Sequence, residues 1–219
     1  MLFVSLENFG PLTDAAFLLS HISHEADVKV SGSRLSIITS DGYRHYVAAL
    51  HIWEPFFVDY YVRHHISSRI SLQTFRRTLR QAGENHCSSI TIHMEELRTH
   101  KRLFLQFQNL SCVWERELML SHSEEEDLDQ IEIDYENYFM IHSDDFRHII
   151  REVAHFPNYS VWVTITNSQV KFSFASKEII LTKQGGGCQI VGYEGEVETR
   201  FRIFLHPASF FLTLSIQAQ

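Results

Sequence analysis

The chain has 219 residues, of which 44% are apolar and 21% charged, a balance that excludes an intrinsically disordered protein and is typical of globular domains. Its formal net charge of −8 argues against a uniformly basic nucleic-acid-binding domain, so the placement of the 19 basic residues matters more than their number. The three cysteines lack the spacing of a zinc or redox motif, which favours a protein of a reducing compartment. No apolar run approaches the roughly 20 residues of a membrane-spanning helix.

The first half of the chain alternates between strand and helix patterns. A strand at Leu2 to Leu6 precedes a helix at Pro11 to Ser23, whose apolar residues recur at three- and four-residue intervals. A second helix, Ser71 to Ala82, is followed by Gly83, which we expect to end it. Alternating segments between turn-forming residues predict strands at Val28 to Val30, Leu35 to Thr39, Tyr43 to Trp53, Phe56 to Tyr61, Ser89 to Met94, Arg102 to Phe107 and Val113 to Leu120.

An acidic connector at residues 121–134 follows, and after it the order restarts. Ser143 is the expected N-cap of a helix that runs to His155, with acidic residues in its first turn. We therefore expect a first domain at 1–120 and a second at 135–219 that lacks its last strands. The other elements expected in the second domain are strands at Tyr135 to Ile141, Ser160 to Thr166, Val170 to Phe174, Glu178 to Thr182 and Arg200 to Leu205, and a helix at Pro207 to Ile216.

Two of the expected helices carry arginines on the side opposite their apolar stripe. Any amphipathic helix exposes charge, but here the arrangement recurs in both halves of an otherwise acidic chain, which favours contacts to phosphate groups. The apolar stripes are Leu72, Phe75, Leu79 and Ala82 in one helix and Phe146, Ile149, Ile150 and Val153 in the other. The predicted DNA-binding residues are Arg76, Arg77 and Arg80 in the first helix and Arg147 and Arg151 in the second.

No motif for enzymatic chemistry is found. The 14 histidines do not form an H-E-x-x-H motif, and there is neither a G-x-S-x-G elbow nor a phosphate-binding P-loop. The sequence therefore predicts a protein without catalytic residues, metal or cofactor. In the connector, the apolar residues Leu128, Ile131 and Ile133 either pack on their own domain or bind a partner protein.

The order and spacing of these segments resemble the sliding clamps of the proliferating cell nuclear antigen superfamily. The resemblance covers most of the chain and is carried by segments such as Phe3 to Asn8, Arg102 to Phe107, Phe146 with Arg147 and Arg151, and Val170 to Phe174. It implies an α+β DNA-clamp fold of two similar domains, each with antiparallel sheets outside and two helices lining the inner face. It also implies a non-enzymatic ring around double-stranded DNA in the nucleus, bound without sequence specificity.

Two departures from the replicative clamps distinguish the type of clamp. Thr39 to Arg44 and Asp129 to Asp134 differ from the replicative pattern, and the helix Leu12 to Ser23 has no Lys or Arg. The chain is most similar to the Rad-one subunit of the nine-one-one checkpoint clamp, although Pro55 to Phe57 resembles its Rad-nine subunit. This resemblance implies a heterotrimer in DNA-damage checkpoint signalling and repair, with a clamp loader and repair or replication proteins as partners. The alternatives are a homotrimeric replicative processivity factor and a truncated protein-interaction module that does not encircle DNA.

The resemblance also implies how neighbouring subunits join. The strand Val113 to Leu120 of one subunit would pair with Glu178 to Lys183 of the next, as in β-strand addition. The implied interface residues are Val113, Glu115, Glu117 and Leu118 on one strand and Ile179, Ile180 and Leu181 on the other.

Overall fold

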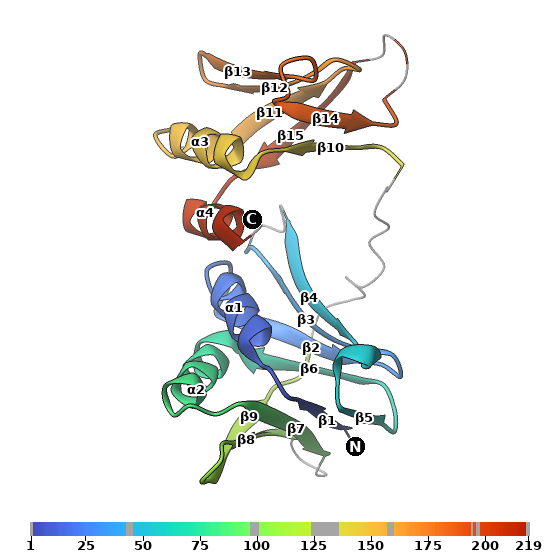
Figure 1. Ribbon diagram of the computed structural model, residues 1–219, viewed down its shortest axis with the longest axis vertical. Helices are drawn as coiled ribbons and strands as arrows, with labels where there is room; N and C mark the ends of the chain where they lie inside the picture. The colour runs from blue at the N-terminus through green and yellow to red at the C-terminus, as the bar shows by residue number, and fades with distance from the viewer. Residues whose placement is uncertain are drawn as a thin grey trace. The chain divides into compact units, whose positions relative to one another are not determined.

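The computed structural model describes residues 2–42, 46–96, 101–123, 136–156, 160–193, 195 and 198–217. The predicted α+β class is confirmed, because these residues form four α-helices and antiparallel sheets (Figure 1). The chain divides into unit 1, residues 1–128, and unit 2, residues 129–219, at a point inside the predicted connector. Among the described residues, no helix is both long enough and apolar enough to cross a membrane.

Unit 1 contains two helices and two sheets. One sheet has the strand order β5-β1-β7-β8-β9 and the other β4-β3-β2-β6, and all their pairings are antiparallel. A short 3-10 helix, Glu54–Phe56, precedes β5. The elements are β1 (Leu2–Leu6), α1 (Gly10–Leu19), β2 (Glu25–Val30), β3 (Arg34–Ser40), β4 (Val47–Trp53), β5 (Asp59–Val62), β6 (Ile66–Ser71), α2 (Leu72–Glu84), β7 (Ser89–Glu96), β8 (Lys101–Gln108) and β9 (Val113–Leu120).

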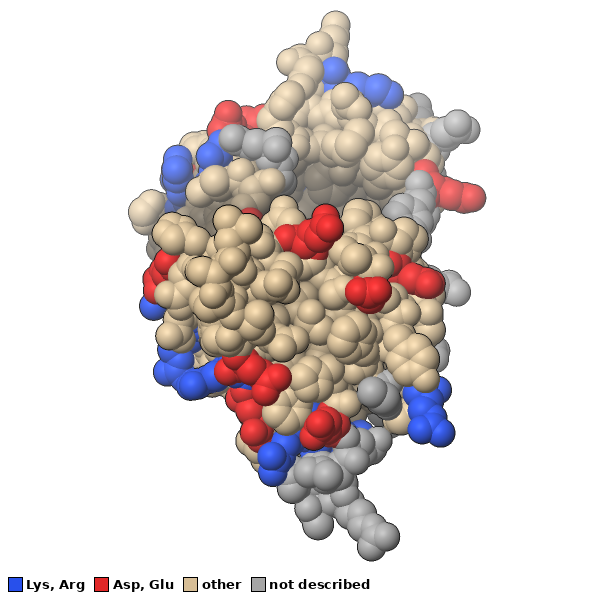
Figure 2. Space-filling view, turned by 60° about the horizontal axis from the view of Figure 1, so that its bottom comes forward, with Lys and Arg blue, Asp and Glu red and all other residues tan. Residues whose placement is uncertain are grey.

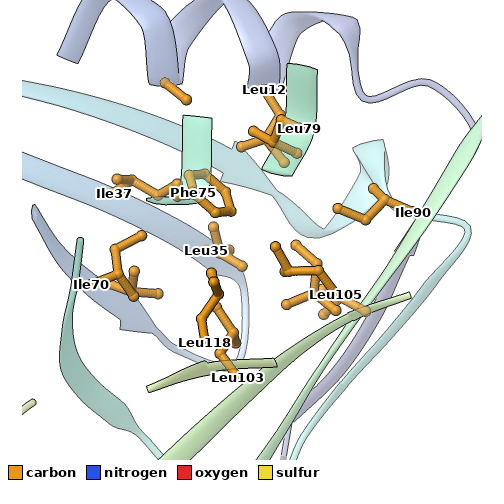
Figure 3. Packing of buried hydrophobic residues seen from close by; sticks show 14 of the residues in the cluster. Leu12, Leu35, Ile37, Ile70, Phe75, Leu79, Ile90, Leu103, Leu105 and Leu118 are labelled. Carbon is orange, nitrogen blue, oxygen red and sulfur yellow. The ribbon is translucent and has the colours of Figure 1, made fainter. Parts of the chain in front are cut away.

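The core of unit 1 lies between its helices and its sheets. The apolar stripe predicted for α2 is confirmed, because Leu72, Phe75, Leu79 and Ala82 are all buried. Figure 3 shows Phe75 among aliphatic side chains from both sheets. A fully buried side chain of this size contributes about 1.5–3 kcal/mol of hydrophobic free energy, so the packing fixes which side of α2 faces solvent.

Unit 2 has its own core, formed by residues from two helices and two sheets. Its sheets have the strand orders β10-β14 and β13-β12-β11-β15. The elements are β10 (Tyr138–Ile141), α3 (Ser143–Val153), β11 (Ser160–Ile165), β12 (Gln169–Phe174), β13 (Lys177–Thr182), β14 (Cys188–Val191), β15 (Thr199–Phe204) and α4 (Ala208–Gln217).

The two units repeat one topology. In unit 1, β2 pairs with β3 and β6 and β1 pairs with β5, while in unit 2, β11 pairs with β12 and β15 and β10 pairs with β14. The helices α1 and α2 correspond in chain order to α3 and α4, and in each unit the two helices contact each other. The described part of unit 2 contains no counterpart of β7, β8 and β9. The similarity of the halves is therefore one of strand pairing as well as of element order.

Three predicted helix ends are wrong. The first helix stops at Leu19, where Ser20 is the C-cap, and α3 begins at Ser143 itself, so that the N-cap is His142. Gly83 lies inside α2, which continues to Glu84. The left-handed position after this helix is taken by His86, with φ of 54°, and the amide of Cys87 donates to the carbonyl of Ala82. The amide of His86 also donates to the carbonyl of Gly83, and the two bonds together form a Schellman motif, in which glycine is preferred but not required.

The strand predictions differ from the structure in several places. β2 begins at Glu25 rather than Val28, and β4 and β10 begin at Val47 and Tyr138, whereas the predicted starts Tyr43 and Tyr135 lie outside the described residues. Phe56 is the last residue of the 3-10 helix Glu54–Phe56, which contains Pro55, and β5 starts only at Asp59. The strands Ile66–Ser71 and Cys188–Val191 were not predicted. The first is rich in serine and the second follows three glycines, and both compositions resemble loops when tertiary pairing is not known.

Candidate nucleic-acid interface

The arginines of α2 lie on its solvent side but differ in exposure. Arg77 and Arg80 are exposed, whereas Arg76 is half-buried. Ser71 caps the helix by accepting a hydrogen bond from the amide of Thr74 through its hydroxyl, which stabilises the first turn. A shallow hollow on this surface is lined by Gln73 together with the three arginines. The three predicted residues are therefore brought together on one helix face.

Arg76 is held against the end of α1. Its guanidinium carbon lies 4.3 Å from the ring centroid of Phe17, and its Nη1 donates to Ser20 Oγ over 3.3 Å. Both partners lie at the C-terminal end of α1, where the helix dipole favours a positive charge. Since α1 has no Lys or Arg of its own, Arg76 supplies the positive charge at this end of the helix.

The same contact affects His21. Burial lowers the pKa of His21 below its usual value, and the charge of Arg76 lowers that pKa further. Both causes favour the neutral form of the imidazole beside the arginine. Neither Phe17 nor Ser20 was predicted as part of this site, because their role depends on the packing of α1 against α2.

Arg77 and Arg80 have few competing interactions. Arg80 Nε lies 3.4 Å from Glu84 Oε1, and both side chains are about two-thirds exposed, at 67% and 65%. An ion pair this exposed contributes little free energy and is easily exchanged for a phosphate. No ion pair of Arg77 is found within the described part of the chain. These two arginines are thus the most available cations of α2.

The two predicted arginines of α3 are not equivalent. Arg147 pairs with Asp144 and its side chain is only 19% exposed, while Arg151 is exposed in the last turn. Asp144 belongs to the acidic first turn, where the helix dipole favours negative charge. It also lies three residues before Arg147, within reach of the guanidinium of that residue. Arg147 is therefore less available to phosphate than Arg151.

The positions implied for subunit contacts lie on edge strands. β9 ends the five-stranded sheet of unit 1 and β13 ends the four-stranded sheet of unit 2. Val113, Glu115, Glu117 and Ile180 are exposed, and Ile179 and Leu181 pack partly on the core of unit 2. Leu118 is different, because its side chain is 5% exposed in the core of unit 1 and cannot contact another subunit.

The predicted partner-binding residues of the connector, Leu128, Ile131 and Ile133, lie outside the described residues.

Among the residues that are described, no three His, Cys, Asp or Glu side chains are grouped so as to hold a metal ion. Figure 2 shows a face on which acidic groups are scattered among uncharged ones and basic groups lie toward the margins.

Known families and proteins do not identify the chain. No protein-family model matches its sequence, and no curated protein matches it significantly.

The Arg76 contact predicts a change in the titration of His21. In an Arg76→Gln variant, the pKa of His21 should rise, because the nearby positive charge is removed, but it should stay below 6.5 since burial is the larger cause. Nuclear magnetic resonance titration of the imidazole protons measures this pKa. Arg77→Gln is the matched control and should leave it unchanged. An unaltered His21 pKa in Arg76→Gln would contradict the contact.

Proposed function

We propose that this chain is a non-enzymatic subunit of a ring-shaped DNA sliding clamp that acts in DNA-damage checkpoint signalling and repair. The proposal is supported chiefly by the repeated topology of the two units. Each unit contains a pair of helices packed on sheets, and the strands of these sheets are paired in the same way in both units. Such repetition suits a ring, because a closed ring presents equivalent surfaces at successive positions around its hole.

The helix faces support DNA as the enclosed partner. Arg77, Arg80 and Arg151 are exposed on helices, and phosphate contacts from such side chains bind duplex DNA without reading its sequence. The helices α1 and α4 carry no Lys or Arg. A subunit with so few exposed arginines is expected to bind DNA weakly by itself, which suits a clamp that holds DNA by enclosing it.

The sheet edges support assembly into a ring. β9 and β13 are terminal strands of different sheets, and each exposes at least one large apolar side chain, Val113 at 55% and Ile180 at 48%. Exposed strand edges pair readily with another strand. A subunit with one such edge in each unit can join a neighbour on either side, as a heterologous ring requires.

The arginine face of α2 predicts a salt-dependent interaction with duplex DNA. An Arg77→Gln/Arg80→Gln variant should bind a 30-base-pair duplex more weakly at low salt, measured by fluorescence anisotropy. The slope of log affinity against log salt should become less steep by about 0.9 for each phosphate contact that is lost. Arg63→Gln is the matched control, because Arg63 is an exposed arginine at the opposite end of β6 from α2. Equal slopes for both variants would refute the proposed interface.

The mass of the purified chain separates a checkpoint subunit from a homotrimeric replicative clamp. A subunit that joins two different partners should be monomeric by light scattering, at 25.6 kDa. A species of three times that mass would contradict the checkpoint assignment. The Arg63→Gln protein should give the same mass as the wild type, because that residue lies on neither β9 nor β13.

A further inference from the structure

Unit 2 carries a ladder of stacked arginines and aromatic rings. The guanidinium carbon of Arg200 lies 4.5 Å from the ring centroid of Trp162, and that of Arg202 lies 5.8 Å from Trp162 and 4.9 Å from Phe204. β11 and β15 are paired so that Trp162 is opposite Arg202. We call these four residues the arginine–tryptophan ladder.

The ladder lies on the face of the sheet that points away from the helices. Val161 and Val163 of β11 are buried in the same core as Ile150 of α3. Side chains alternate along a strand, so Trp162 faces the opposite side. Trp162 is 41% exposed, and both arginines are exposed. The ladder is therefore open to solvent.

The corresponding place in unit 1 has different chemistry. There Asp27 of β2 is opposite Arg69 of β6, and the Nε of Arg69 donates to Asp27 Oδ1 over 3.2 Å. Asp27 is only 3% exposed. Both strand pairs occupy the same position in the repeated topology, so Trp162 stands where unit 1 has the carboxylate. The arginine of unit 1 is neutralised inside its own sheet.

The arginines of the ladder keep their charge available. Among the described residues, no carboxylate pairs with Arg200 or Arg202. Stacking on an indole fixes the guanidinium plane but leaves its N–H donors unused, and those donors match a carboxylate in a two-point contact. Because the side chains are already ordered, less conformational entropy is lost when an anion binds.

We propose that the arginine–tryptophan ladder binds an acidic peptide segment in an extended conformation. Arg200 and Arg202 are two residues apart on one strand, which places them roughly 6.6 Å from each other. The same repeat separates side chains i and i+2 of an extended peptide. A segment with acidic residues at alternate positions therefore presents one carboxylate to each guanidinium.

A peptide fits this surface better than a nucleic acid does. Single-stranded nucleic acids bind by stacking their bases on free faces of aromatic rings along a basic groove, whereas two guanidinium groups already lie over the Trp162 ring and compete with a base for its surface. The chain as a whole carries a net charge of −8, which disfavours the binding of a long polyanion. The same charge has a smaller effect on the binding of a short acidic segment. The ladder contains none of the predicted DNA-binding arginines and lies on the face of its sheet that points away from α3, so this inference does not depend on the proposed function.

The test uses a fluorescein-labelled peptide of eight residues in which Glu and Thr alternate. Fluorescence anisotropy at low salt should show saturable binding, and Arg200→Gln and Arg202→Gln should each weaken it about tenfold, as expected for loss of a charge-assisted hydrogen bond. The matched control is Arg34→Gln, because Arg34 also lies over an indole, 5.3 Å from the centroid of Trp53, in unit 1. That variant should bind the peptide like the wild type. A peptide of alternating Gln and Thr should not bind.

Three results would overturn the inference. The first is an absence of binding by the wild type, and the second is equal affinity in the Arg200, Arg202 and Arg34 variants. The third is that a 20-nucleotide oligothymidylate displaces the peptide at lower concentration and loses affinity in the same variants, which would make the ladder a nucleic-acid surface. Circular dichroism of each variant establishes that a loss of binding does not come from unfolding.

Discussion

The direction of the arginine face depends on the packing of α2 into the core of unit 1. Leu72, Phe75 and Leu79 are buried between the two sheets and the helix α1. A turn of the helix by one residue, about 100°, would remove these side chains from the core and bring arginine toward it. Burying an unpaired charge is far more costly than the hydrophobic energy involved. The packing of the core therefore determines that Arg77 and Arg80 face solvent. A contact between the two arginines is not required to hold them in this direction.

The repeated topology shows how one scaffold can carry two outward chemistries. The inward positions of β2 and β11 are apolar in both units, as each core requires. The outward positions are free to differ, and Asp27 in one unit corresponds to Trp162 in the other. In unit 1 an arginine is neutralised within the sheet, while in unit 2 two arginines remain exposed on an aromatic support. Divergence of function between such repeats is expected on the faces that do not contribute to the core.

Much of the architecture could be predicted from periodic patterns. The stripe of α2 and the alternation in Arg102 to Phe107 reflect burial on one side, so they predict a helix and a strand without tertiary information. Ile66–Ser71 could not be recognised in this way, because serine occupies both faces of the strand: Ser68 is buried while Ser67 and Ser71 are exposed, so the sequence does not alternate between apolar and polar residues. His86 takes the left-handed position that Gly83 was expected to take, since the hydrogen bonds of the Schellman motif outweigh the preference for glycine.

The candidate site was predictable only in part. The helical wheel groups Arg76 with Arg77, but the stacking of Arg76 on Phe17 arises from the contact of two helices that are far apart in sequence. Similarly, the pairing of Arg147 with Asp144 depends on the rotamer of each side chain. The wheel therefore identifies the basic face, whereas the contacts decide which of its arginines are available.

The most direct test of the account is site-specific photocrosslinking to duplex DNA. A photoreactive residue placed at Arg77 should crosslink to the duplex, because that side chain is exposed on the arginine face of α2. The same residue at Phe104, which lies between the buried Leu103 and Leu105 of β8 and so faces away from the core, should not crosslink. Crosslinking from position 104 but not from position 77 would contradict a DNA interface on α2.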